Sequence, residues 1–394
     1  MFLQYVVMGA IWPIMSLYLR QYLNFSGTQT GIVMAMSAIA AFVAPVVGAC
    51  VADRLISAER LLSLCHFSAA CCMGLMVLQT RFEWVLVLYL TYTLSMGPTV
   101  PLTNAITFHH APEGQQKFGN IRVWGTVGWV AVAWCFGFFW LNHTGDTTQV
   151  GRLPDALKLS ALMSMGLGGY GLTLPRVGKR VEGPVRLFPV ESIRVLLNPR
   201  VLLIAMVSLL VGMVDRYYYF GTSLYLQHLG YPESLIMPFM SVGQMTEIVS
   251  MCLLAWTLAR LGTKQTLLLG LLAEIGRFSA FAFGSSKLVI LAGNACHGLA
   301  YTFYFTTVYI TIDGFCDKQS RTGLHQLFTL MTAGLGALFA NLLGGRCLDI
   351  FVKTKAIADY RAFWLVPLSI SMVALVLIGV WFKDGSSETR AKAK

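Results

Sequence analysis

The chain has 394 residues, of which 56% are hydrophobic and only 12% are charged, and its formal net charge is +11. Soluble domains carry about 25% charged residues, so this composition excludes a water-soluble protein. The apolar runs are continuous instead of alternating, which excludes a transmembrane β-barrel. Lys and Arg lie in short loops between these runs, as membrane orientation signals do, so the positive charge does not indicate a nucleic-acid partner.

Apolar segments follow one another along the whole chain, most of them near or above the roughly 20 residues that cross a bilayer as a helix. The first segment, 2–23, contains Trp12, Pro13 and Arg20 where a signal peptide would need a plain apolar core, so we interpret it as a membrane helix. The predicted spans are 2–23, 29–52, 60–79, 83–108, 119–141, 156–174, 201–227, 232–258, 264–284, 286–312, 321–346 and 361–382. The sequence therefore predicts an all-α polytopic membrane protein with twelve transmembrane helices.

A long basic interruption separates the sixth span from the seventh. It predicts an N-terminal six-helix bundle at 1–174, a basic linker at 175–200, a C-terminal six-helix bundle at 201–382 and a tail at 383–394. Since Lys and Arg are retained in cytoplasmic loops, we expect the linker, the tail and both termini to lie in the cytoplasm.

The loop after the second span adds a short motif. Residues Gly48 to Arg54 have the pattern G-x-x-x-x-D-R, and Glu59 and Arg60 follow. Together with two six-helix halves, this loop resembles the major facilitator superfamily. The resemblance implies the major facilitator fold, in which the Asp of the loop faces a helix N-terminus of the other half.

Ionisable side chains inside the spans need a physical reason, because each costs at least about 2.5–3.5 kcal/mol at the bilayer centre. Glu274 and Arg277 are three residues apart on one helix face, which favours a structural pair. Asp215 and Arg216 are adjacent, so they point about 100° apart and cannot both face one spot. The aromatic run 217–220 that follows is typical of packing and would also suit stacking on a base.

Two further groups suit a polar ligand. Arg122, Thr126 and Trp129 lie on one helical stripe, which suits a ligand with a ring and several hydroxyls. Equally, Arg122 could extend to the cytoplasmic surface from the start of its span. Gln244 and Glu247 lie well inside the eighth span, so they face a cavity or a partner helix. A carboxylate held there can gain or lose a proton near neutral pH, as a proton-coupled carrier requires.

Several motifs resemble the bacterial nucleoside:proton symporters of the major facilitator superfamily, and the likeness covers nearly the whole chain. The motifs are Ser95–Asn104, Ile121–Trp129, the Gln244-x-x-Glu247 pair, Ile275–Phe278, His297–Tyr301 and Arg321-Thr322. The resemblance implies a nucleoside site that is lined by Arg122, Thr126, Trp129, Asp215, Tyr218, Gln244, Glu247, His297 and Tyr301.

Two positions depart from that family. His297 stands where the family has Tyr, and Thr302 stands where the family has an Asp that is linked to proton coupling. Thr cannot carry a titrating proton. Coupling then depends on Glu247, on Asp215 or His297, or is absent; Glu247 is the first candidate and Asp215 the second.

The predicted function is import of nucleosides by proton symport with alternating access around a midplane site. The alternative is an uncoupled facilitator for nucleosides or another polyol-like solute such as a sugar. A nucleoside sensor is a further class. No H-x-x-x-x-D motif, metal cluster or activated nucleophile is present in the sequence, so we expect neither an enzyme nor a metal or cofactor. The expected setting is the bilayer of a bacterial inner membrane, with the chain as a monomer.

Overall fold

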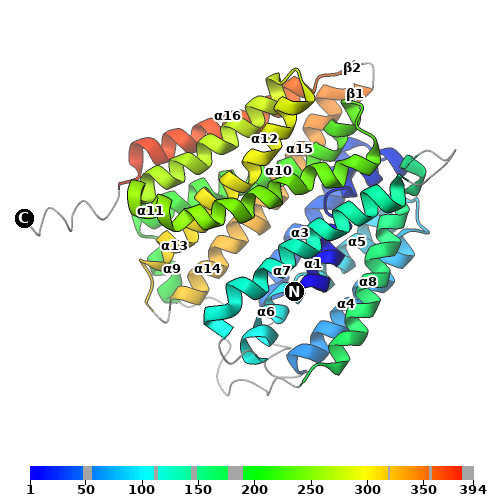
Figure 1. The fold of residues 1–394 in the computed structure, drawn as a ribbon, viewed down its shortest axis with the longest axis horizontal. Coiled ribbons are helices and arrows are strands. Elements are labelled where there is room, and N and C mark those ends of the chain that lie inside the picture. The colour runs from blue at the N-terminus through cyan, green and yellow to red at the C-terminus, as the bar shows by residue number, and fades with distance from the viewer. Residues whose placement is uncertain are drawn as a thin grey trace, which may run out of the picture. The chain divides into compact units, whose positions relative to one another are not determined.

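The computed structural model describes residues 1–47, 56–110, 114–142, 149–175, 190–317, 320–354 and 357–383. These residues are helical apart from loops and one short pair of antiparallel strands, β1 (Val352–Thr354) and β2 (Ile357–Ala358) (Figure 1). The loop motif Gly48–Arg54, most of the linker and most of the tail lie outside the described residues.

The chain forms two compact units. Unit 1 contains residues 1–187, 216–241 and 337–358, and unit 2 contains residues 188–215, 242–336 and 359–394. The division passes through one helix between Asp215 and Arg216 and through the next between Ser241 and Val242. These units group residues by compactness, so the predicted bundles 1–174 and 201–382 remain a prediction.

Unit 1 holds most helices of the first half of the chain. These are α1 (Phe2–Gly9), α2 (Met15–Leu17), the π-helix η1 (Tyr18–Tyr22), α3 (Gly27–Val47), α4 (Ala58–Met76), α5 (Phe82–Met96), α6 (Thr99–His110), α7 (Gly114–Trp134), the π-helix η3 (Cys135–Leu141), the 3₁₀-helix η4 (Gln149–Arg152) and α8 (Pro154–Thr173). Unit 1 also holds α15 (Ala337–Phe351) and the strand pair that follows it.

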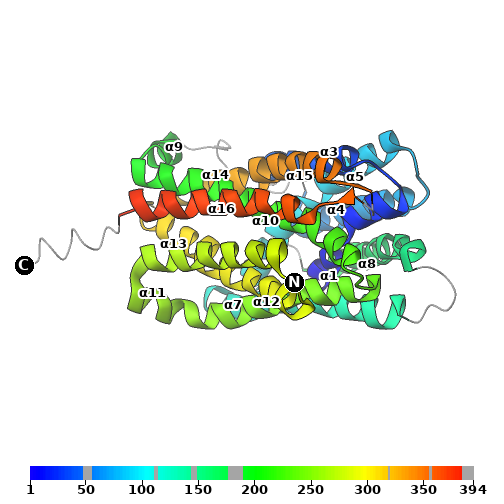
Figure 2. The same ribbon diagram turned by 90° about the horizontal axis from the view of Figure 1, so that it is seen from above.

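Unit 2 holds most of the second half. Its elements are α9 (Val190–Leu196), α10 (Pro199–His228) as far as Asp215, α11 (Glu233–Phe283) from Val242, α12 (Lys287–Ala300), the π-helix η5 (Tyr301–Thr306), α13 (Thr307–Asp313), α14 (Arg321–Thr329), the π-helix η6 (Leu330–Gly336) and α16 (Tyr360–Trp381). In Figure 2, the helix axes of α11 and α16 lie roughly parallel to each other.

Eight stretches of the described residues are long and apolar enough to cross a membrane. One of them, α11, has 51 residues, about 76 Å at 1.5 Å per residue, which is enough for two crossings. Its backbone leaves the helical conformation at Gly262, where φ is 81° and ψ is 176°. Glycine adopts this positive φ without a Cβ clash. The break lies between the predicted spans 232–258 and 264–284, so it separates them as expected.

Other spans are interrupted where the sequence weakens the helix. The first span breaks between α1 and α2, around Pro13, and the fourth between α5 and α6, at Gly97-Pro98. Proline lacks an N–H and clashes with the preceding turn, which explains both breaks. Within the described residues, four π-helical segments lie inside or at the end of predicted spans, and such segments often occur at functional sites.

Glycines bring helices of unit 1 into close contact. A Cβ at Gly31 in α3 would overlap the carbonyl oxygen of Asn341 in α15, and the side-chain amide of Asn341 donates to the carbonyl of Met34 at 3.2 Å. Small residues and interhelical hydrogen bonds are the usual means of helix association in a membrane. The α3–α15 pair is therefore one of the tightest parts of unit 1.

An aromatic cluster fills the interior of unit 2 between α11 and α16. The Trp364 ring is fully buried, with ring centroids 5.9 Å from Phe278, 5.0 Å from Phe281 and 5.0 Å from Phe363. Offset and edge-to-face pairs at these separations add to the stabilisation by burial. The cluster anchors the helix segment that carries Glu274 and Arg277.

Candidate functional site

The predicted site residues are divided between the two units. Arg122, Thr126, Trp129 and Tyr218 belong to unit 1, and Asp215, Gln244, Glu247, His297 and Tyr301 belong to unit 2. Each group has its own set of neighbours, and the single cavity expected to hold all nine remains a prediction.

Arg122 lies over an aromatic ring that the sequence analysis did not identify. Its guanidinium carbon is 4.4 Å from the centroid of the Tyr5 ring in α1, a cation–π distance. The contact is close because Gly125, one turn along α7, has no side chain: a Cβ there would lie 2.8 Å from the Tyr5 ring. Tyr5 therefore holds the half-buried Arg122 in place beside α1.

Trp129 belongs to a second aromatic and cationic group of unit 1. It is almost fully buried and packs edge-to-face against Trp12, with ring centroids 6.0 Å apart. The Arg216 guanidinium lies 5.4 Å from the Trp12 ring and 5.9 Å from the Tyr219 ring. Tyr219, in the aromatic run 217–220, thus contacts the Arg216 guanidinium. Both rings near Arg216 belong to unit 1, as Arg216 itself does.

Tyr218 is fully buried and packs against Tyr219 at a centroid distance of 5.0 Å. Its carbonyl accepts a hydrogen bond from the Thr222 hydroxyl at 2.6 Å. These contacts place Tyr218 inside unit 1 with its backbone bonded within α10.

In unit 2, the crossing of α11 and α12 determines where the site residues lie. A Cβ at Gly298 would overlap the backbone nitrogen of Glu247, so the two backbones touch here. The Thr246 hydroxyl donates to the carbonyl of Ala295 at 2.7 Å and ties the helices together. A Cβ at Gly243 would lie 2.9 Å from the His297 ring, so this glycine makes room for the imidazole.

His297 lies in a buried group of ionisable side chains. Arg277 forms an ion pair with Glu274 on its own helix face, as the spacing predicts, and its other terminal nitrogen donates to Nδ1 of His297. The same Nδ1 is 3.8 Å from Oδ1 of Asp215 on α10. Asp215 and Arg216 thus have different partners, which confirms that adjacent residues on this helix face different directions.

Tyr301 and Thr302 begin the π-helix η5. The Tyr301 ring is 6.4 Å from His297 and 5.4 Å from Phe305, and Tyr301 is 38% exposed. Thr302 is fully buried, and its hydroxyl lies 3.5 Å from the carbonyl oxygen of Glu247. Gln244 is buried and Glu247 is half-buried on the facing helix. Tyr301 is thus the more accessible of the aromatic pair at the end of α12.

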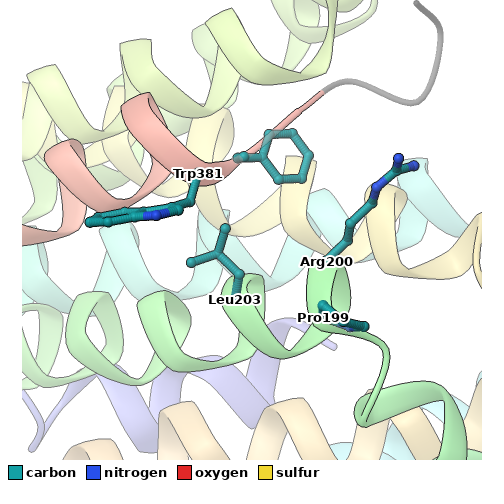
Figure 3. Close-up of a pocket in the computed structure, with 5 residues that line it drawn as sticks. Pro199, Arg200, Leu203 and Trp381 are labelled. Carbon is teal, nitrogen blue, oxygen red and sulfur yellow. The ribbon is translucent and has the colours of Figure 1, made fainter. Parts of the chain in front are cut away.

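The structure has a pocket of about 310 Å³ at another place in unit 2 (Figure 3). It is lined by Pro199, Arg200, Leu203, Trp381 and Phe382, at the start of α10 and the end of α16. Asp215 lies sixteen residues after Pro199, about 24 Å along the helix. The pocket is therefore separate from the group around His297.

Among the residues that the structure describes, no group of three or more His, Cys, Asp or Glu side chains is arranged to hold a metal ion. Three contributors were not identified from the sequence as part of the site: Tyr5 and Trp12 in unit 1 and Arg277 in unit 2. Tyr5 and Trp12 are seven residues apart in the apolar segment 2–23, a spacing that predicts two aromatic rings on one side of a helix. This spacing is the sequence signal from which the two rings could have been identified.

Comparison with known proteins gives a match over nearly the whole chain. Residues 1–387 match the model of the family described as Nucleoside H+ symporter. Among curated relatives from Escherichia coli (strain K12), the putative nucleoside transporter YegT is 28% identical over 99% of this chain and 94% of its own length. The nucleoside permease NupG is 23% identical over 97% of this chain and 94% of its own length. These relatives are transporters, not enzymes.

Solved structures show the same fold. The crystal structure of the nucleoside transporter NupG has a TM-score of 0.85 and 22% identity, and covers 97% of both chains. An inward-facing, unoccupied bacterial homolog of the human lysosomal transporter Spinster has a TM-score of 0.71 and 16% identity, over 96% of this chain and 93% of its own. The fold is therefore that of the major facilitator superfamily, as predicted.

Proposed function

This chain belongs to the nucleoside H+ symporter family, and we propose that it imports nucleosides together with protons by alternating access. The observation that carries the proposal is the family match over residues 1–387, which includes every predicted site residue. Relatives over nearly the same length are described as a xanthosine permease and a nucleoside permease. The proposed cargo is accordingly a purine or pyrimidine nucleoside.

The proposed nucleoside site uses the nine predicted residues. Arg122, Gln244 and Glu247 offer hydrogen bonds to ribose hydroxyls or base edges, with Thr126 as a further hydroxyl. Trp129 offers a stacking face for the base, together with Tyr301. Tyr5 acts as a positioning residue, because its ring lies under the Arg122 guanidinium. The remaining three residues of the proposed nucleoside site are Asp215, Tyr218 and His297.

The proposed coupling needs a group that gains a proton outside and loses it inside. Thr302 cannot be that group, and its hydroxyl faces a backbone carbonyl. Glu247 and Asp215 are the carboxylates predicted for the role. If neither they nor a neighbouring group titrates, the chain is an uncoupled facilitator, which is the second candidate function that Thr302 favours.

The proposed setting is the bacterial inner membrane, with both termini, the linker 175–200 and the tail 383–394 in the cytoplasm. The basic linker supports this orientation, because positive loops stay on the cytoplasmic side. The proposed unit of transport is the monomer, organised as bundles 1–174 and 201–382.

Uptake into proteoliposomes tests the proposal. The purified chain should accumulate radiolabelled uridine and adenosine when the outside is more acidic than the inside, and only equilibrate them when the pH is equal. Unlabelled hexose should not compete. Equilibration without accumulation under a pH gradient would indicate the facilitator. Binding without any uptake would indicate a sensor, and competition by hexose would indicate that the transported substrate is a sugar.

A further inference from the structure

A group of four ionisable side chains lies inside unit 2 and consists of two carboxyl groups, one guanidinium and one imidazole. Its members are Asp215 on α10, Glu274 and Arg277 on α11, and His297 on α12, and none is more than 6% exposed. Burying a charge in a membrane protein is costly unless another charge balances it. In this group Arg277 pairs with Glu274, and a proton gained by the imidazole would bring a positive charge next to Asp215.

The hydrogen bonds assign the present protonation of His297. Arg277 has only N–H donors, so the nitrogen that it contacts must accept. Nδ1 of His297 therefore presents its lone pair to Arg277, and the ring proton is on Nε2. In this arrangement His297 is neutral, and Arg277 is shared between His297 and Glu274.

The same nitrogen has a second partner of opposite charge within reach. Oδ1 of Asp215 lies 3.8 Å from Nδ1, longer than a hydrogen bond but close enough to form one after a small shift. A proton on Nδ1 would remove the lone pair that Arg277 uses and would repel the guanidinium. It would also place an N–H donor and a positive charge beside the Asp215 carboxylate. The proton therefore selects between Arg277 and Asp215.

Several other titratable groups lie around His297. On α10 and α11 they include Asp215, Glu247, Glu274 and Arg277, and on its own segment they include Cys296 and Tyr301. The absence of a side chain at Gly243 lets the imidazole fit against α11.

We propose that His297 binds the transported proton, with Arg277 as its partner when neutral and Asp215 as its partner when protonated. The inference rests on the proposed proton symport and specifies its proton site. In the step, a proton from outer water adds to the Nδ1 lone pair, the Arg277 contact breaks and the Nδ1–H bond to Asp215 forms. Release to inner water reverses it. Glu247 is then a substrate contact instead of the proton carrier.

The test measures protons carried per uridine. Proteoliposomes with the full chain and an internal pH dye receive an inward gradient of labelled uridine at equal pH on both sides. Uridine uptake and internal acidification are recorded together, so the ratio is independent of turnover. His297→Gln keeps an amide oxygen that can accept from Arg277 but cannot titrate, and the ratio should fall at least tenfold. His66→Gln is the matched control and should keep the native ratio: His66 is another fully buried histidine, bonded to Gln4 at 2.9 Å in unit 1.

The outcomes separate the inference from the proposed function. An unchanged number of protons per uridine in His297→Gln would overturn the inference. If only Glu247→Gln lowers this ratio, Glu247 is the proton carrier instead. Uridine entry without acidification in the native protein would contradict the proposed proton symport, and the inference would fail with it.

If His297→Gln moves no uridine, the pH dependence of uridine binding between about pH 6 and 8 tests the inference instead. Native binding should change at least fivefold across that range, and binding to His297→Gln and Asp215→Asn should stay flat. Variant profiles that follow the native one would overturn the inference.

Discussion

Asp349 accepts two hydrogen bonds from Thr28, a residue 321 positions earlier in the chain: one from its backbone N–H at 2.7 Å and one from its hydroxyl at 2.6 Å. The other carboxylate oxygen accepts the N–H of Gly27 at 2.6 Å. Gly27 and Thr28 begin α3, so the carboxylate of α15 caps a helix N-terminus that would otherwise leave its first N–H groups without acceptors. The favourable interaction of an anion with the helix dipole adds to these bonds.

Removing this cap should destabilise the fold. Asp349→Ala should lower the free energy of unfolding by about 1–3 kcal/mol, because donors at the start of α3 lose their partner. A thermal melt of the purified protein in detergent measures the effect. Asp359 provides a comparison: it caps α16 with a single bond to the N–H of Ala362 at 2.9 Å, so Asp359→Ala should shift the melt less. Equal shifts for the two variants would contradict the importance of the α3 cap.

The contact between α11 and α12 should not tolerate a methyl group at Gly298. A Cβ there meets the backbone of Glu247 and Gly243, neither of which can rotate away as a side chain could. Gly298→Ala should therefore cost about 1–3 kcal/mol of stability and also weaken nucleoside binding, because Glu247 and His297 lie at the crossing. Melting and uridine binding assays measure the two effects. Gly276→Ala is the control: only Cys296 lies within reach of its Cβ, at 3.9 Å, and this variant should behave as the native protein.

Gln244 should contribute directly to nucleoside affinity. If its amide bonds a ribose hydroxyl or a base edge, Gln244→Ala leaves that group unpaired, at a cost of about 1–3 kcal/mol. Uridine should then bind roughly ten- to a hundredfold more weakly, as measured with labelled ligand at constant pH. Gln227→Ala serves as the control, because Gln227 donates to Glu233 at 2.8 Å and belongs to no predicted site. Native affinity in Gln244→Ala with an intact fold would remove Gln244 from the site.

Tyr5 should matter through its aromatic ring. The Arg122 guanidinium lies over the ring face, and a cation–π contact of this kind contributes about 0.5–2 kcal/mol. Tyr5→Leu should free Arg122 to move and weaken uridine binding by roughly two- to tenfold, whereas Tyr5→Phe should retain the native affinity. Competition binding assays with the native protein, Tyr5→Leu and Tyr5→Phe measure the order of their uridine affinities. Equal affinity in Tyr5→Leu would show that Arg122 does not depend on the ring.

The sequence by itself determined the features that depend on neighbouring residues. Span positions follow from hydropathy added along one segment, so the limits of α10 and α16 agree with prediction to within two residues at each end. The pairing of Glu274 with Arg277 follows from one helical turn, and the separation of Asp215 from Arg216 follows from the angle between adjacent residues. Both relationships depend only on the geometry of a single helix, which follows from its period of about 3.6 residues per turn.

The tertiary structure decided which helix faces meet. His297 is 20 residues from Arg277 and 82 from Asp215, and Thr28 is 321 from Asp349, so no periodic pattern relates these partners. The rotation and depth of each helix depend on where its small residues permit close approach, as at Gly243 and Gly298. A periodic pattern identifies which side chains share a face of one helix but does not specify the partner helix. For that reason the buried charge group around His297 could be recognised only after α10, α11 and α12 had packed.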